Sequence, residues 1–93
     1  TARATFNAQL ATIVSRLKPL SNDLILINIP PTTAIGVITR SQYNAEIAAV
    51  ATAQSVTLVD VSSAYNTGTH TTAGTHPNDV GAAVLAGLVE TAL

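Results

Sequence analysis

The sequence predicts an α/β fold in which helices pack on a parallel sheet, and three observations support this prediction. Apolar residues recur at helical spacing in three segments, and two short apolar runs of strand character separate those segments. The resulting order, α-β-α-β-α, is typical of parallel strands joined by crossover helices. The first apolar run, residues 24–29, shows no polar alternation, so both faces of that strand are expected to be buried.

The N-terminal third is expected to form one helix and one strand. The helix spans about residues 3 to 18 and ends at Lys18-Pro19, because proline disfavours the helical conformation of the residue before it. Strand 24–29 ends at Pro30-Pro31, since proline donates no hydrogen bond to a sheet. Asn28 lies within this apolar strand and must be hydrogen-bonded if it is buried. The apolar stripe of the helix consists of Phe6, Leu10, Ile13, Val14 and Leu17.

The middle of the chain is expected to form a loop, a helix and a second strand. The loop, residues 31–40, is rich in threonine, and Ser41 is expected to cap the helix, which runs to about Gln54. The second strand covers residues 56–61 and carries Asp60 near its end. The apolar stripe of this helix consists of Tyr43, Ile47, Val50 and Ala51.

The C-terminal third is expected to form a loop and a last helix. The composition of residues 62–76 is polar and typical of a flexible loop. Asn78 is a favourable N-cap residue for the helix that follows. The buried stripe of this helix is expected to consist of Val80, Val84, Leu85 and Leu88.

With 93 residues the chain forms one domain at most, residues 1–93. Apolar residues make up 47% and charged residues 10%, a high apolar share for a small domain. Either the many small residues account for this share, or a partner covers some apolar faces. The strands favour a partner, because two strands alone do not form a stable parallel sheet. Further strands are expected from an N-terminal half of the same fold, from a second chain or from a homo-oligomer.

Charge and residue types exclude several classes of function. A net charge of −1 gives no electrostatic footprint for nucleic acid, and the longest apolar run, residues 24–29, is too short to span a membrane. The absence of cysteine excludes disulfides, thiolate zinc sites and a cysteine nucleophile. The spacing of His70, His76 and Asp79 matches no zinc motif, so neither a metal nor a cofactor is expected. The first residue is not Met, which indicates processing or truncation.

The densest group of candidate functional residues is the block 74–81, Gly-Thr-His-Pro-Asn-Asp-Val-Gly. In a parallel α/β sheet ligands bind at the carboxyl ends of the strands, and this block closes the loop after the last strand. Pro77 fixes the backbone beside His76, and Asn78 caps the next helix. This position suits a general base that takes a proton from a hydroxyl or from water near neutral pH. The alternative is a surface histidine in a helix-capping turn.

The block 74–81 resembles the last conserved block of the SGNH (GDSL) hydrolases, where Asp-Gly-x-His-Pro-Asn precedes a glycine and an apolar helix. Residues 26–31, Leu-Ile-Asn-Ile-Pro-Pro, are similar to the strand after the family's Asn block. Residues 43–61 resemble the helix and strand before the His block. The resemblance covers essentially the whole chain. It implies the C-terminal portion of a flavodoxin-like, three-layer α/β/α fold with a parallel sheet.

The resemblance gives His76 the role of the catalytic general base that activates a serine. In the family this serine belongs to a Gly-Asp-Ser block at the N-terminal end of the fold and forms an acyl-enzyme. The oxyanion donors are the N–H of that serine, a glycine and an asparagine from upstream blocks. None of these blocks is present in this sequence, so the chain alone is not expected to be an enzyme.

The family's orienting aspartate stands three residues before the histidine, and this position is Ala73 here. A main-chain carbonyl could hold the Nδ1–H of His76 instead, or Asp60 at the end of the second strand could do so. Asp79 is a further candidate, although the helix dipole already explains a carboxylate in a first turn. Asp60 also has a plainer interpretation, as a polar residue at a strand end. The remaining interpretation is a decayed, non-catalytic site.

Two functions therefore stay open. In the first, the intact protein hydrolyses an acyl or acetyl ester of a lipid or carbohydrate. This chain then supplies His76, and a missing N-terminal segment or a partner chain supplies the serine. In the second, the chain is a non-catalytic SGNH-like binding or structural module, for instance of a secreted or viral surface protein. The low charge and the richness in Thr and Ala agree with a secreted or particle-associated protein.

Overall fold

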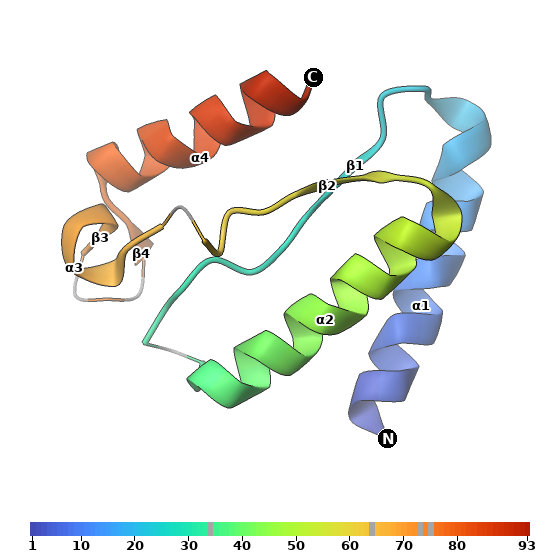
Figure 1. The fold of residues 1–93 in the computed structure, drawn as a ribbon, viewed down its shortest axis with the longest axis horizontal. Coiled ribbons are helices and arrows are strands. Elements are labelled where there is room, and N and C mark those ends of the chain that lie inside the picture. Colours follow the sequence, from blue (N-terminus) through green and yellow to red (C-terminus); the bar gives the residue numbers. More distant parts are fainter. Residues whose placement is uncertain (34, 64, 73, 75) are drawn as a thin grey trace.

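The computed structural model describes the chain except for Ala34, Ala64, Ala73 and Thr75. The described residues form a small mixed α/β domain in which helices flank a short parallel sheet (Figure 1). The predicted order α-β-α-β-α is confirmed, with one additional small unit between the second strand and the last helix. The finer prediction of a flavodoxin-like fold is not confirmed, because the parallel sheet of the described residues contains two strands.

The first helix, α1 (Ala2–Leu17), agrees closely with the predicted range. Thr1 caps it, since its Oγ1 accepts a hydrogen bond from the N–H of Ala4 at 3.1 Å. A single 3-10 turn, η1 (Lys18–Leu20), follows and contains Pro19. Of the predicted apolar stripe, Val14 is buried, whereas Ile13 is 53% exposed. The prediction is therefore wrong for Ile13 and for Leu17, which is 41% exposed, because the described chain does not cover them.

The second helix, α2 (Val37–Gln54), begins four residues before the predicted cap, Ser41. Gly36 occupies the N-cap position in extended conformation, and the N–H of Arg40 bonds its carbonyl oxygen at 2.9 Å. The Thr-rich segment before Ser41 was expected to be a loop, but β-branched residues disfavour a helix by only about 0.5 kcal/mol each. Val37 and Ile38 are exposed, so the first turn extends the helix from its packed part, where Phe6 and Tyr43 are in edge-to-face contact at 5.0 Å.

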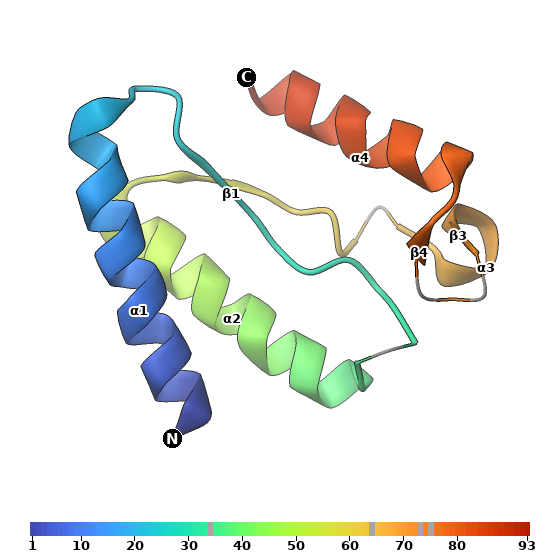
Figure 2. The same ribbon diagram turned by 180° about the vertical axis from the view of Figure 1, so that it is seen from behind.

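The sheet pairs β1 (Ile25–Ile27) with β2 (Thr57–Val59) in parallel, with Ile25 opposite Thr57. Helix α2 lies on one side of the strands and α4 (Asp79–Ala92) on the other (Figures 1 and 2). The expected burial of both strand faces is not met, because Ile27 is 46% exposed. A sheet of two strands has two open edges, and so its helices cannot enclose every apolar side chain.

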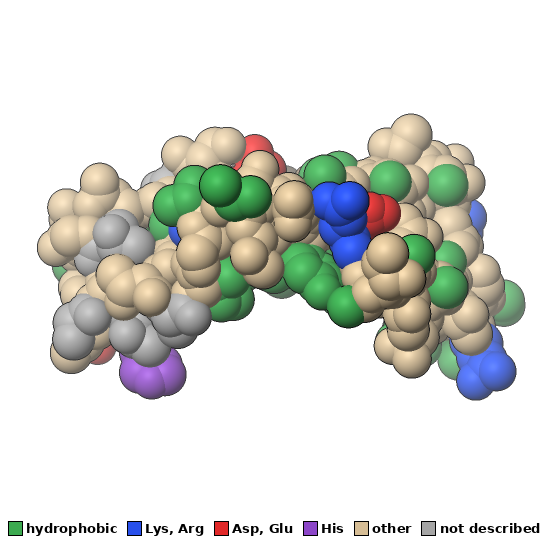
Figure 3. Space-filling model, turned by 90° about the horizontal axis from the view of Figure 1, so that it is seen from below, with side chains coloured by type: hydrophobic (Ala, Val, Ile, Leu, Met, Phe, Trp, Pro, Cys, Tyr) green, Lys and Arg blue, Asp and Glu red, His purple; other side chains and the backbone are tan. Residues whose placement is uncertain are grey.

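The overall shape is a thin slab. Its extents are 37 × 33 × 15 Å, and its radius of gyration of 13.9 Å exceeds the roughly 12 Å of a compact chain of this length. Figure 3 shows that the slab is bent, with hydrophobic side chains in the hollow of its underside. Eight large apolar side chains of the described chain are exposed: Ile13, Leu17, Leu20, Ile27, Val37, Ile38, Val80 and Leu93.

The predicted loop of residues 62–76 contains regular structure instead. It includes a short helix, α3 (Thr67–His70), and two antiparallel strands, β3 (Thr71–Thr72) and β4 (His76–Pro77). Asn66 starts the unit, because its Oδ1 accepts hydrogen bonds from the N–H groups of Gly68 and Thr69. The sequence pattern did not reveal this unit, since elements of two to four residues show no hydrophobic periodicity.

Asn78 caps α4 as predicted. Its Oδ1 accepts from the N–H of Gly81 at 2.8 Å, and its Nδ2 donates to the carbonyl oxygen of Thr69 at 2.9 Å. The cap thus joins α4 to α3. Three residues of the predicted stripe, Val84, Leu85 and Leu88, are half-buried. Val80 is 55% exposed, so the prediction is wrong there, because the first turn of α4 presents Gly81 to α3 instead.

Two glycines of α4 test this packing. A Cβ on Gly81 would lie 2.0 Å from the carbonyl oxygen of His70, whereas a Cβ on Gly87 would meet nothing within 4 Å. We expect Gly81→Ala to lower the free energy of unfolding by about 2 kcal/mol or more, because backbone must move. Gly87→Ala should raise it by about 0.5–1 kcal/mol through helix propensity. Chemical denaturation followed by circular dichroism measures both, and equal effects would contradict the packing of α3 on α4.

Candidate functional site

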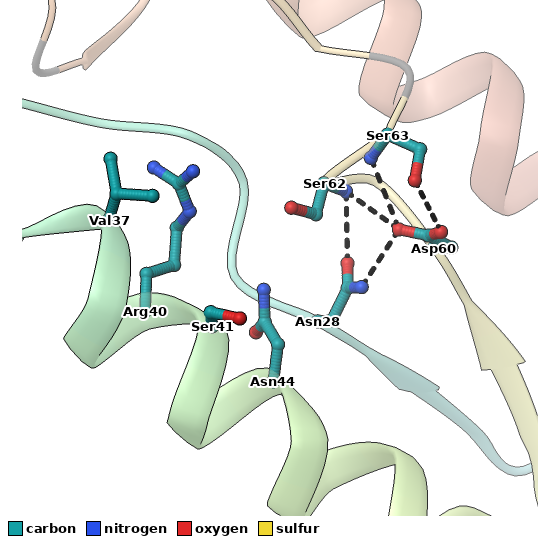
Figure 4. Close-up of a pocket in the computed structure, with 8 residues that line it drawn as sticks. All are labelled: Asn28, Val37, Arg40, Ser41, Asn44, Asp60, Ser62 and Ser63. Carbon is teal, nitrogen blue, oxygen red and sulfur yellow. Dashed lines mark hydrogen bonds between the residues drawn. The ribbon is translucent and has the colours of Figure 1, made fainter.

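A polar pocket of about 300 Å³ opens at the carboxyl ends of β1 and β2. This is the end of a parallel sheet at which α/β proteins bind their ligands. Figure 4 shows Arg40, Ser41 and Asn44 of α2 on one side of the pocket and the residues after β2 on the other. The complete lining is Asn28, Val37, Arg40, Ser41, Asn44, Asp60, Ser62 and Ser63.

Asn28 connects the two strand ends. It is buried, with 8% of its surface exposed, and its Oδ1 accepts from the N–H groups of Val61 at 2.8 Å and Ser62 at 3.1 Å. Its Nδ2 donates to Oδ1 of Asp60 at 2.9 Å. The prediction that a buried Asn28 is hydrogen-bonded is confirmed, and its amide continues the pairing of the strands beyond their last backbone bond.

The carboxylate of Asp60 organises the turn after β2. Its Oδ1 accepts from the amide of Asn28 and from the N–H groups of Ser62 and Ser63, and its Oδ2 accepts from Oγ of Ser63 at 2.7 Å. The Asn28 amide, followed by the Ser63 hydroxyl, lowers the pKa of Asp60 below its ordinary value of 3.8, and slight desolvation opposes them. All these donors belong to the strand ends. The orienting role of Asp60 toward His76 stays a prediction.

His76 lies in β4, two residues before the cap of α4, and its side chain is exposed. The loop that carries it is fastened to the loop after β1, because the N–H of Thr33 donates to the carbonyl oxygen of Gly74 at 2.7 Å. Gly74 has a φ of +77°, and a Cβ there would lie 2.6 Å from Thr33. Within the described residues, no group hydrogen-bonds the His76 ring. Ala73, at the family's aspartate position, lies outside the described residues.

His70 is held by its neighbours rather than solvated. It is half-buried, and its Nδ1 accepts from the N–H of Asn66 at 2.8 Å. Its ring lies 5.4 Å from that of Tyr65, whose hydroxyl donates to the His70 carbonyl oxygen at 3.2 Å. His70 therefore has a structural role in closing α3. The only sequence signal was the four-residue spacing from Asn66, which is too common to be diagnostic.

Two pocket residues were not singled out by the sequence pattern. Asn44 binds the backbone after β1 twice, because its Oδ1 accepts from the N–H of Ile29 at 2.8 Å and its Nδ2 donates to the Ile29 carbonyl oxygen at 3.0 Å. Arg40 is half-buried and directs its guanidinium toward the pocket (Figure 4). In sequence it is one of four scattered basic residues, and only the start of α2 at Val37 brings it to the sheet edge.

The described residues contain neither a cluster of metal ligands nor a membrane-spanning helix. No three His, Asp or Glu residues there gather into a group that could hold a metal ion. Asp79 lies in the first turn of α4, as expected. No helix of the described residues combines the length and apolar character that crossing a membrane requires.

Comparison with models of protein families, with curated proteins and with solved structures gives no match for this chain. The resemblance to the SGNH hydrolases thus rests on residues 74–81 and the segments before them.

Acid should weaken the fold partly through Asp60. Because the folded-state pKa of Asp60 lies below 3.8, its contribution is present in full above about pH 5. It is lost as the pH falls from about 4 through the folded-state pKa. We expect Asp60→Asn to be less stable than the wild type at pH 7 and to lose less stability between pH 5 and pH 2. Unfolding by urea at a series of pH values measures both effects.

Ser63→Ala provides a graded control, since it removes one of the donors to Asp60 and leaves the carboxylate in place. Its acid dependence should lie between those of the wild type and Asp60→Asn. Parallel stability curves for all three proteins would show that the Asp60 network contributes nothing to acid sensitivity.

Proposed function

We propose that this chain supplies the catalytic histidine of a serine ester hydrolase of the SGNH type. The main support for this proposal is the position of His76. Its exposed imidazole lies on a loop that is hydrogen-bonded to Thr33 at the carboxyl end of the parallel sheet. Its substrate is an acyl or acetyl ester of a lipid or a carbohydrate. The Gly-Thr-His-Pro-Asn-Asp-x-Gly block gives the family, and the cap by Asn78 supports it because it fixes the helix that follows.

The reaction assigns His76 four proton transfers, two in each half of the cycle. Its imidazole takes the proton of a serine hydroxyl while the serine oxygen bonds to the ester carbonyl carbon. The imidazolium then protonates the departing alkoxide as the ester C–O bond breaks, which leaves an acyl-serine. A water molecule, deprotonated by the same imidazole, then bonds to the acyl carbon. The imidazolium protonates the serine oxygen as its bond to that carbon breaks, which releases the carboxylic acid and regenerates the serine. The exposed His76 ring has no competing hydrogen bond within the described chain, which suits this task.

The serine and the oxyanion donors must come from an N-terminal half of the same fold, on the same precursor or on a second chain. The open sheet supports this requirement. β1 and β2 form three residue pairs, Ile27 is 46% exposed, and the slab is 15 Å thin. Strands added at its edges would cover Ile27 and extend the row of carboxyl ends beside His76.

A non-catalytic binding or structural module is the second candidate. The lack of a free carboxylate to orient His76 favours it. The carboxylate of Asp60 is fully engaged by Asn28, Ser62 and Ser63, and the sequence has Ala73 at the family's aspartate position. An imidazole without an acceptor for its Nδ1–H loses orientation and basicity. In this case the fold would serve assembly on a secreted or particle-borne protein.

The two candidates differ in what accompanies the chain and in the role of His76. Native and denaturing mass spectrometry of the purified protein should reveal a second fragment with a Gly-Asp-Ser block. Their complex should hydrolyse short p-nitrophenyl esters. We expect His76→Ala to lower kcat/KM by at least about a thousandfold. Because the His76 side chain is exposed, the free energy of unfolding of His76→Ala should differ from that of the wild type by less than about 0.5 kcal/mol.

His70→Ala is the matched control, since it removes the other histidine of the unit formed by α3, β3 and β4. It should lower stability by about 1 kcal/mol or more, because Asn66 loses its acceptor and Tyr65 its ring contact. The folded fraction should retain its ester hydrolysis. Purification of the chain without a serine-bearing fragment, or full activity of His76→Ala, would overturn the hydrolase proposal in favour of the module.

A further inference from the structure

The pocket at the carboxyl ends of β1 and β2 contains a cation that the fold leaves unpaired. Arg40 is half-buried on α2, and Figure 4 shows its guanidinium extending along the pocket beside Val37. In the described part of the chain, its side chain forms neither an ion pair nor a hydrogen bond. Its backbone N–H donates to the carbonyl oxygen of Gly36 at the start of the helix. The guanidinium therefore keeps all five N–H donors for another group.

Asp60 lines the same pocket but does not neutralise Arg40. Its carboxylate is directed toward Asn28 and the two serines, as the dashed lines in Figure 4 show. Four hydrogen bonds from neutral donors satisfy it, which is why its pKa is lowered without a cationic partner. The positive charge of Arg40 is thus left for a ligand rather than matched within the pocket.

Two hydroxyl groups complete the donor set. Ser41 follows Arg40 on α2, and Ser62 lines the other side of the pocket from the turn after β2. Within the described residues, neither Oγ takes part in a hydrogen bond, although the N–H of Ser62 is bonded to Asn28 and Asp60. A guanidinium and two hydroxyl groups that line one pocket are donors suited to the paired oxygens of a carboxylate, sulfate or phosphate group. The volume of about 300 Å³ is large enough for such a group.

We propose that this pocket binds a small oxyanion group, with Arg40 as its bidentate anchor and the hydroxyls of Ser41 and Ser62 as further donors. Carboxylate, sulfate and phosphate share this chemistry, whether free or attached to a larger ligand. The site does not depend on the hydrolase proposal, because none of its donors is His76 or a group from another chain.

Amide and side-chain NMR of the nitrogen-15-labelled protein, with any copurifying fragment bound, tests the proposal. Malonate, sulfate and phosphate are titrated separately at constant ionic strength, with chloride as the balancing anion. We expect saturable shifts at Nε of Arg40 and at the amides of Ser41 and Ser62 with at least one probe. Saturable binding of malonate alone would identify a site for a planar carboxylate. Saturable binding of sulfate or phosphate would identify a site for a tetrahedral anion.

Arg40→Gln should weaken binding of the active probe at least tenfold, and Arg40→Lys should have an intermediate effect because it keeps the charge without the fork. Neither should disturb the amide spectrum, since the Arg40 side chain bonds no other described residue. Arg3→Gln, which removes an exposed cation of α1, is the matched control and should bind like the wild type. Equal binding by Arg40→Gln, or only non-saturating shifts spread over Arg3, Arg16 and Lys18, would overturn the proposal.

Discussion

The side chain of Asn28 is the constraint on which the carboxyl edge of this fold depends. The parallel ladder covers three residue pairs and ends at Ile27 and Val59. Beyond it, the Asn28 side chain accepts hydrogen bonds from two backbone N–H groups that follow β2 and donates one to Asp60. The two chain segments therefore stay joined beyond the ends of the strands. A buried amide left without these partners would cost about 1–3 kcal/mol, which fixes one arrangement of the turn. The pocket walls and Asp60 take their positions from it.

The coarse fold could be predicted from the sequence because three helices and two strands carry strong periodic signals. Helix α1 and the burial of Ile47 and Val50 in α2 follow directly from apolar spacing. The errors have two physical causes. Burial of Ile27 and Val80 was expected from pattern alone, but exposure depends on how many neighbouring elements are present. The start of α2 was placed too late because the helix extends from its packed part into an exposed first turn, where the β-branched residues disfavour helix only weakly.

The site was less predictable, because its contacts join residues far apart in sequence. The pattern singled out His76, Asp60 and Asn28, each at the end of an element, where chemistry is common in α/β folds. It gave no reason to select Arg40, since a lone arginine carries no motif and its place depends on where α2 begins. The partners of Asp60 were equally hidden, as Asn28 and Asp60 are 32 positions apart.

The two histidines of the unit formed by α3, β3 and β4 differ in how their rings are held, although the same backbone contacts fix both. The unit is held by the bond from Thr33 to Gly74, by the N–H of Asn78 on the His70 carbonyl oxygen, and by the close approach of Gly81. His70 contributes its own ring to this framework and accepts from Asn66. His76, four residues beyond β3, sits on the same framework while its ring bonds nothing else in the described chain. The general base that we propose would therefore still need an acceptor for its ring N–H from a group outside the described residues, because orientation of the imidazole depends on such a partner.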